Sequence, residues 1–265
     1  MGSKLVGMQI PLYQVDAFTS QLFKGNPAAV CPLERWLPDE TLQAIAAENN
    51  LSETAFFVPN GEHYALRWFT PVCEVDLCGH ATLAAAWVIL ERLNRDAEEA
   101  VFDTRSGVLT VARDGDRLSM DFPSRPPKFC DPPPGLLEAL GGEPLEVLRG
   151  QYYLVVYGSE QEIRALDPDF RALAKIGDGV IVTAPGDEAD FVSRFFAPAL
   201  GVDEDPVTGS AHCTLVPYWT VRQGKWWFEA RQLSARGGEL HCEDHGERVT
   251  IAGRAVLYLE GAIYL

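Results

Sequence analysis

The sequence predicts an α+β protein built from two similar halves, each a curved mixed β-sheet wrapped round a central hydrophobic helix. Strand-like runs separated by turn residues dominate the chain. Each half also contains a glycine-opened helix rich in apolar residues, and the pattern around the first of these helices recurs about half a chain later. A helix that is apolar on almost every side must be enclosed by protein, and a curled sheet can enclose it.

In the first half, the apolar and β-branched runs predict strands, and two longer segments predict helices. The first helix is expected over Leu37–Asn50, with Asp39 at its N-cap, and the second over Gly79–Leu93. The predicted strands are PLYQVDAF, ETAFFVP, YALRWFT, AVFDTRSGVLTVAR and RLSMDFP.

A proline-rich segment marks the expected boundary between the halves. Residues Pro123–Gly135 hold six prolines among thirteen residues, a composition typical of stiff linkers. We therefore expect the halves to span 1–124 and 125–265. Strands resume with QYYLVVY, GVIVTAP and FVSRFFAP, and the closing strand AVLYLEGAIYL could return to the first half.

An internal duplication explains why the two halves resemble each other. The segment Leu66–Trp87 can be laid on Val192–Trp219, with a proline-containing loop before each helix. The offset grows from 127 at the arginines to 130 at the glycines, so about three residues are inserted between them. The matched positions are Arg67 with Arg194, Gly79 with Gly209, and Asp76 close to Asp203.

Composition and charge exclude several classes of partner. A net charge of −16 and a pI near 4.7 argue against binding to nucleic acid or to an anionic membrane surface. The longest apolar run, Ala81–Leu90, is shorter than the roughly 18 residues of a membrane span. Six scattered cysteines indicate reduced thiols and a cytoplasmic protein. We expect no metal, because the run His241–His245 is typical of an exposed polar hairpin.

The two helix starts carry different polar groups. A glycine there lets a ligand approach the backbone, and the free N–H groups favour an anion. Imidazole, carboxylate and hydroxyl groups suit proton transfer on a small anionic molecule held by both starts. Simpler roles stay open: the glycines can serve helix packing, His80 and Ser210 can cap, and Asp205 can be a turn residue. The first start presents Cys78, Gly79 and His80, and the second presents Asp205, Gly209 and Ser210.

Glu53 opens an apolar strand, which is unusual for a carboxylate. It is either a surface residue or, in a closed cleft, a general base whose pKa is raised by desolvation. Its counterpart in the second half, near Gly179–Val180, has no carboxylate. Asn26, in the GNP turn, is a candidate lining residue of the same cleft.

Four motifs together resemble the phenazine-biosynthesis isomerase-like (PhzF-like) family, within the diaminopimelate-epimerase-like superfamily. They are FTSQLFKGNPAAVC, NNLSETAFF, LCGHATLAAAWV and EDPVTGSAH, and the resemblance extends from about Leu12 to the final strand. It implies a diaminopimelate-epimerase-like fold with the site between the halves, and cofactor-free movement of a proton between ring carbons of a hydroxylated dihydroaromatic amino acid. It assigns general acid/base catalysis to Glu53. Substrate-carboxylate binding and help with proton movement fall to Gly79, His80, Asp205, Gly209 and Ser210.

We therefore expect a cofactor-free isomerase of a small carboxylic or amino acid, with an anionic small-molecule substrate. Exposed apolar edges and the closing strand favour a homodimer. One alternative is a two-thiol epimerase or racemase, in which Cys78 would supply the first thiol, although no cysteine stands at the start of the second helix. The other is a non-catalytic binding protein for small acids. The expected catalytic residues are Glu53, His80 and Asp205, and the expected substrate-binding residues are Gly79, Gly209, Ser210 and Asn26.

Overall fold

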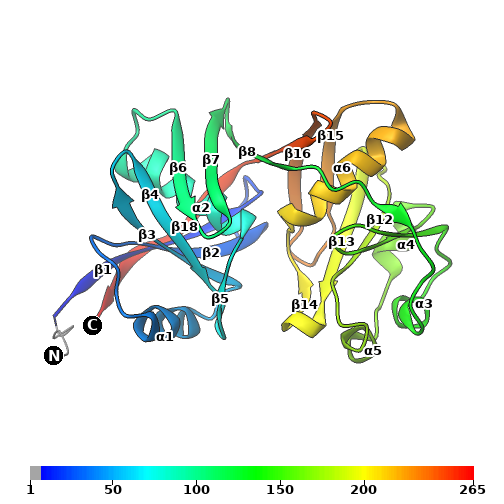
Figure 1. The fold of residues 1–265 in the computed structure, drawn as a ribbon, viewed down its shortest axis with the longest axis horizontal. Coiled ribbons are helices and arrows are strands. Elements are labelled where there is room, and N and C mark those ends of the chain that lie inside the picture. Colours follow the sequence, from blue (N-terminus) through cyan, green and yellow to red (C-terminus); the bar gives the residue numbers. More distant parts are fainter. Residues whose placement is uncertain (1–6) are drawn as a thin grey trace. The chain divides into compact units, whose positions relative to one another are not determined.

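A computed structural model describes residues 7–265, so residues 1–6 of the predicted first half lie outside the described part of the chain. The chain divides into two compact units (Figure 1). The first comprises the chain up to Met120 together with Arg254–Leu265, and the second is Asp121–Gly253. Each unit contains one mixed sheet and one long apolar helix, which confirms the α+β class.

In the first unit, the helix α2 (Gly79–Val88) packs against strands β1, β2 and β3 and continues as a π-helical turn over Ile89–Leu93. The expected N-cap of the shorter helix α1 (Asp39–Asn49) is wrong by one residue. Pro38 is the N-cap, and the Asp39 carboxylate accepts a hydrogen bond from Arg67 instead. The strands are β1 Gln9–Ala17, β2 Asn26–Pro32, β3 Glu53–Asn60, β4 His63–Phe69, β5 Glu74–Val75, β6 Glu99–Thr104, β7 Gly107–Asp114, β8 Arg117–Pro123 and β18 Ala255–Tyr264.

In the second unit, the long helix is α6 (Gly209–Gln223), which contacts β16 and β17. Part of the proline-rich segment forms a short strand, β9, that pairs with β10. The other helices are α3 Leu136–Leu140, α4 Glu160–Ala165, α5 Phe170–Ala174 and the 3-10 turn Pro198–Leu200. The strands are β9 Lys128–Phe129, β10 Glu146–Arg149, β11 Tyr153–Val156, β12 Val180–Pro185, β13 Phe191–Ala197, β14 Val202–Asp205, β15 Trp227–Gln232, β16 Gly238–Asp244 and β17 Arg248–Gly253.

The two sheets have the same strand order and the same strand directions. The first runs β18-β1-β2-β3-β4-β6-β7-β8, and the second runs β9-β10-β11-β12-β13-β15-β16-β17. In both sheets the third and fourth strands are parallel, as are the fifth and sixth. The C-terminal strand β18 pairs with β1 and so holds the place in the first sheet that β9 holds in the second.

Individual side-chain contacts are duplicated along with the strands. Arg67 pairs with Glu74 through two hydrogen bonds of 2.6 and 2.8 Å, and Arg194 pairs with Glu204 through two of 2.8 and 3.0 Å. Each guanidinium also lies over a phenylalanine of its own strand. The loops before α2 and α6 are held alike, by Ser106 donating to the Asp76 carbonyl and Ser234 to the Pro206 carbonyl. Both arginines therefore have a structural role.

These contacts correct one part of the sequence alignment. Phe69 pairs with Glu74 in the first sheet and Phe196 pairs with Glu204 in the second, so Glu74 corresponds to Glu204. Asp76 then matches Pro206 rather than Asp203. The three inserted residues lie in the loop before β14, where the 3-10 turn Pro198–Leu200 lengthens the connection.

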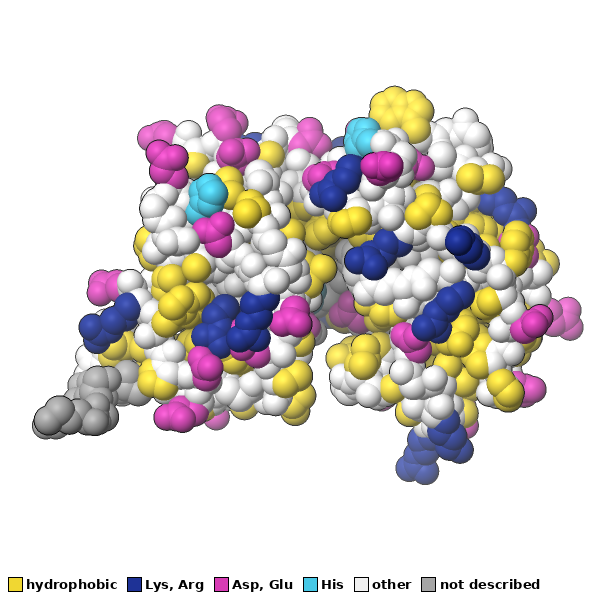
Figure 2. All heavy atoms as spheres, in the orientation of Figure 1, with side chains coloured by type: hydrophobic (Ala, Val, Ile, Leu, Met, Phe, Trp, Pro, Cys, Tyr) yellow, Lys and Arg dark blue, Asp and Glu magenta, His cyan; other side chains and the backbone are white. Residues whose placement is uncertain are grey.

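Charged side chains of both signs are visible on the surface. Figure 2 shows acidic side chains interspersed with Lys and Arg over this face. Among the described residues, no helix is both long and apolar enough to cross a membrane.

His212 is a buried histidine whose titration is expected to affect stability. Its Nδ1 lies 2.9 Å from the Thr208 carbonyl, and burial lowers its pKa from 6.5 to about 4. Below pH 6.5 the unfolded chain therefore binds a proton that the folded chain does not, and stability falls as the pH drops toward 4. Between pH 7 and pH 5 this group should cost about 2 kcal/mol of unfolding free energy.

Urea unfolding of the wild type and of His212→Thr at the two pH values checks this prediction. Threonine is the matched replacement because Thr82, the equivalent residue of α2, bonds the Cys78 carbonyl in the same way. The variant should lose less stability between pH 7 and pH 5 than the wild type. An equal loss in both proteins would contradict the assignment to His212.

Candidate active site

Glu53 is the first residue of β3, and its carboxylate meets the start of α2. The Glu53 Oε2 atom lies 3.1 Å from the His80 Nε2 atom, although the two groups are not aligned for a hydrogen bond. The Glu53 side chain is 18% exposed and that of His80 is 6% exposed. The Glu53 side chain is therefore partly open, whereas the imidazole and the carboxylate oxygen facing it are buried.

Two residues contact the His80 ring from its other side. The His80 Nδ1 atom lies 3.2 Å from Asn26 Nδ2 and 3.5 Å from Cys78 Sγ. An asparagine amide can present its nitrogen or, after a half-turn, its oxygen, so Asn26 can pair with either protonation state of the imidazole. Gly25 fixes the turn that carries Asn26: its φ is 64°, and a Cβ there would lie 2.1 Å from the Ala17 carbonyl oxygen.

The pKa values of Glu53 and His80 are shifted in opposite directions. Burial raises the pKa of Glu53, but the charge of His80 and the close polar contacts with His80 and Cys78 outweigh burial, and the pKa is lowered overall. Burial lowers the pKa of His80, but interactions with Cys78 and Glu53 outweigh it and hold this pKa well above 6.5. The raised carboxyl pKa expected from desolvation alone is therefore wrong, because the imidazole stabilises the carboxylate.

Cys78 is the N-cap residue of α2 and is part of the same cluster. Burial, and then the charge of Glu53, raise the pKa of its thiol to about 11, so the sulfur is protonated near neutral pH. The negative charge beside His80 is therefore that of Glu53. Within the described residues, Glu53, Cys78 and His80 form the one group of at least three His, Cys, Asp or Glu residues close enough to hold a metal ion.

The start of α6 in the second unit presents a different set of groups. Asp205 ends β14, and its carboxylate accepts a short hydrogen bond from the Thr208 hydroxyl. Thr208 is the N-cap residue of α6, and the buried Gln232 accepts from its backbone N–H and donates to the Asp205 carbonyl. Ser210 is half-buried, and a Cβ at Gly209 would meet no atom within 4 Å. Space is thus left beside this buried glycine at the helix start.

The structure gathers the predicted residues into two sets. Glu53, His80 and Asn26 meet at the start of α2 in the first unit. Gly79 and Gly209 begin their helices as expected, and neither His80 nor Ser210 caps its helix, since Cys78 and Thr208 are the N-cap residues. Sequence reasoning missed Thr208 and Gln232 and gave Cys78 a role only in the two-thiol alternative. The duplication was the available signal for Thr208, because it aligns with Cys78.

Comparison with known proteins places this site in a family context. The profile of the phenazine biosynthesis-like protein family matches residues 15–261. An uncharacterized isomerase of Pseudomonas aeruginosa is 56% identical over 97% of this chain and 100% of its own length. The crystal structure of a phenazine biosynthesis protein of the PhzF family from Enterococcus faecalis is 48% identical, with a TM-score of 0.95 over 97% of this chain and 100% of that one.

A more distant structure is similar in fold alone. A hydroxyproline epimerase from Agrobacterium vitis matches with a TM-score of 0.62 at 12% sequence identity, covering 97% of this chain and 93% of that chain. This likeness agrees with a diaminopimelate-epimerase-like architecture.

Proposed function

This chain belongs to the phenazine biosynthesis-like protein family, and from that premise we propose that it is an isomerase that moves a carbon-bound proton on a small carboxylic or amino acid. The observation that carries the proposal is the partly exposed Glu53 side chain, whose carboxylate lies against the buried His80. A carboxylate in reach of a substrate and backed by an imidazole is a general acid/base that needs no further group to accept and return a proton.

In the proposed reaction Glu53 removes a proton from one carbon of the substrate and returns it to another. The lowered pKa keeps Glu53 ionised at neutral pH, which its role as base requires. It also makes Glu53 a weak base, so the C–H bond must be activated by neighbouring unsaturation or carboxyl groups in the substrate. The hydroxylated dihydroaromatic amino acid implied by the family resemblance has such a C–H bond.

Proton uptake by Glu53 changes the acidity of His80. The negative charge of Glu53 is one of the interactions that hold the pKa of His80 up. Once that carboxylate is protonated, burial dominates and the imidazolium becomes a stronger acid. His80 can then support the return of the proton or donate to an oxygen that gains charge in the intermediate. Gly79 and Asn26 border this pair, and we assign Asp205, Gly209 and Ser210 to substrate binding and proton relay at the second helix start.

The two-thiol alternative receives less support from the geometry. The duplicated contacts place Thr208 at the position equivalent to Cys78, and a threonine hydroxyl cannot replace a thiolate base. The remaining thiol, Cys78, has its pKa raised to about 11. The proposed partner is a small anionic molecule, and association of two copies stays a prediction.

Proton NMR in D₂O with a panel of small amino and hydroxy carboxylic acids, including cyclic dienes, tests the proposed function. We expect deuterium incorporation at carbon, or an isomer, for at least one member of the panel. Binding without exchange or isomerisation by any bound acid would favour the non-catalytic binding protein.

A further inference from the structure

The position in the second unit that corresponds to Glu53 is a glycine. In the first sheet Thr54 pairs with Phe69, and in the second Val180 pairs with the equivalent Phe196. The residues before Thr54 and Val180 are Glu53 and Gly179. The general base of the first unit therefore has no side-chain counterpart on the matching strand.

Tyr152 fills the space that this glycine leaves. A Cβ at Gly179 would lie 2.7 Å from ring atoms of both Tyr152 and Phe195, and these two rings pack edge to face with centroids 4.9 Å apart. Tyr152 precedes β11 and corresponds to Ala28, which pairs with Glu53 in the first sheet. At this pair of positions the first unit thus has Ala28 beside Glu53, and the second unit has Tyr152 beside Gly179.

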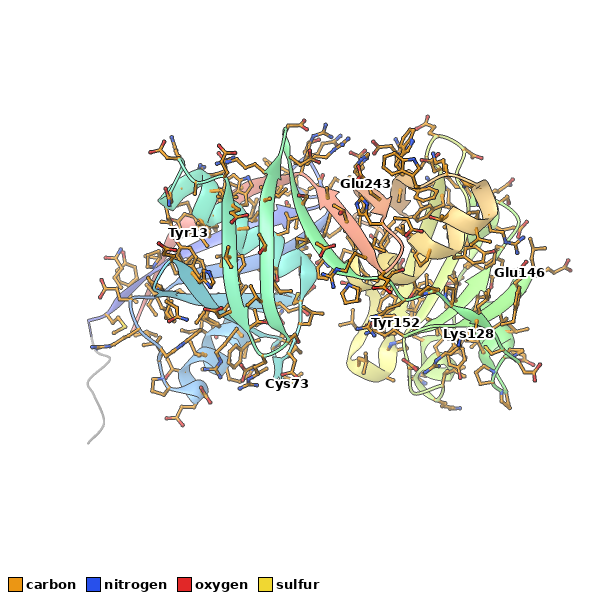
Figure 3. The ribbon with its side chains drawn as sticks, turned by 45° about the horizontal axis from the view of Figure 1, so that its top comes forward. Tyr13, Cys73, Lys128, Glu146, Tyr152 and Glu243 are labelled. Atoms are coloured by element: carbon orange, nitrogen blue, oxygen red, sulfur yellow. The ribbon has the colours of Figure 1, made fainter. Side chains whose placement is uncertain are left out.

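The hydroxyl of Tyr152 contacts Ser210, the residue of α6 that corresponds to His80 of α2. Its oxygen lies 3.4 Å from Ser210 Oγ, and Ser210 is the second residue of α6, as His80 is the second residue of α2. The Gln151 side chain donates to the Tyr152 oxygen at 3.0 Å. With its oxygen accepting from Gln151, the phenol can give its own proton to Ser210, which leaves the serine hydrogen free to donate to a ligand. Figure 3 labels Tyr152 among the side chains of this unit.

We propose that Tyr152 is a positioning residue of the second unit, which orients the Ser210 hydroxyl toward the carboxylate of the bound acid. This inference rests on the proposed assignment of Ser210 to substrate binding. The absence of a carboxylate at Gly179 has a physical reason: a further carboxylate there would add to the charge of Asp205 and repel an anionic ligand at the start of α6, whereas a phenol does not. At these matched positions the first unit thus has the proposed base, Glu53, and the second has the uncharged hydrogen-bonding pair Tyr152 and Ser210.

Tyr152→Phe tests the proposal because it keeps the ring against Phe195 and Gly179 and removes only the hydroxyl. The probes are 2-aminobenzoate and 3-hydroxy-2-aminobenzoate, planar amino acids, with affinities measured by amide NMR titration at up to millimolar concentration. We expect roughly fivefold to tenfold weaker binding of both probes, the range of one ordinary hydrogen bond between uncharged groups such as Tyr152 and Ser210. Loss confined to the hydroxylated probe would place Tyr152 at the ring hydroxyl and overturn the carboxylate role.

A double-mutant cycle separates this role from simple packing. In a Ser210→Ala background, Tyr152→Phe should cause no further loss, because Tyr152 acts through the serine. Additive losses, unchanged affinity in the single variant, or no shifts of the Gly209 and Ser210 amides in the wild type would each overturn the inference. The aromatic probes are not substrates for isomerisation, so this result is independent of the deuterium-exchange test of the proposed function.

Discussion

Glu53→Gln is expected to abolish turnover while leaving the binding of acids within a few-fold of the wild type. Glutamine has nearly the same shape but cannot accept a proton from carbon. A positioned general acid/base typically contributes ~10²–10⁴-fold to the rate, and here no other described carboxylate among the predicted site residues of the first unit could take its place. The measurement is the rate of deuterium incorporation or isomer formation in D₂O with the acid found for the wild type.

Cys78→Ser is the matched control for this variant, since Cys78 lies in the same cluster and is the thiol that a two-thiol mechanism would need. If Glu53 is the base, the serine variant keeps turnover within about tenfold of the wild type, a smaller loss than removal of a general base causes. Retained turnover in Glu53→Gln together with loss in Cys78→Ser would reverse the assignment and restore the thiol mechanism.

His80→Ala is expected to lower the rate at neutral pH by up to about 10²-fold, the low end for an acid/base group, and so by less than the glutamate change. Its more specific effect is on the pH profile. In the wild type, His80 outweighs burial and keeps the pKa of Glu53 below its usual value. Without the imidazole, burial dominates and the pKa of Glu53 rises, so the acid limb of kcat/KM should move to higher pH.

The pH dependence of kcat/KM for the wild type and His80→Ala, between pH 4 and pH 9, measures this shift. His80→Ala should also remove the alkaline limb that belongs to the imidazolium, whose pKa lies well above 6.5 in the wild type. An acid limb at the same pH in both proteins would show that His80 does not set the ionisation of Glu53, even if the rate falls.

The comparison of Gly179 with Glu53 shows why the sequence could identify the duplication but not complete the site. The matched glycines and arginines can be recognised in the sequence, because helix starts and bidentate ion pairs need particular residue types at particular spacings. Tyr152, which precedes β11, fills the space that a side chain at Gly179, which precedes β12, would occupy. This relation is visible only when β11 and β12 are paired in register.

The ionisation of Glu53 and His80 was also beyond sequence reasoning. Glu53 at the start of an apolar strand suggested desolvation and a raised pKa, and burial does act in that direction. The net shift of the Glu53 pKa is downward because of His80, which is distant in sequence and reaches the carboxylate only because β3 begins beside the start of α2. Electrostatic interactions depend on distances of a few ångströms, which spacing along a chain does not specify.

The sequence by itself determined the α+β class, the two duplicated halves, the two glycine-opened helices and the residue types at their starts, because each of these follows from hydrophobic periodicity, turn residues and repetition. The tertiary structure decided the return of β18 to the first sheet, the pairing of Glu53 with His80 and the contact of Tyr152 with Ser210 in the second unit. Those three outcomes depend on strand register and on the packing of residues far apart in the chain, which local patterns leave undetermined.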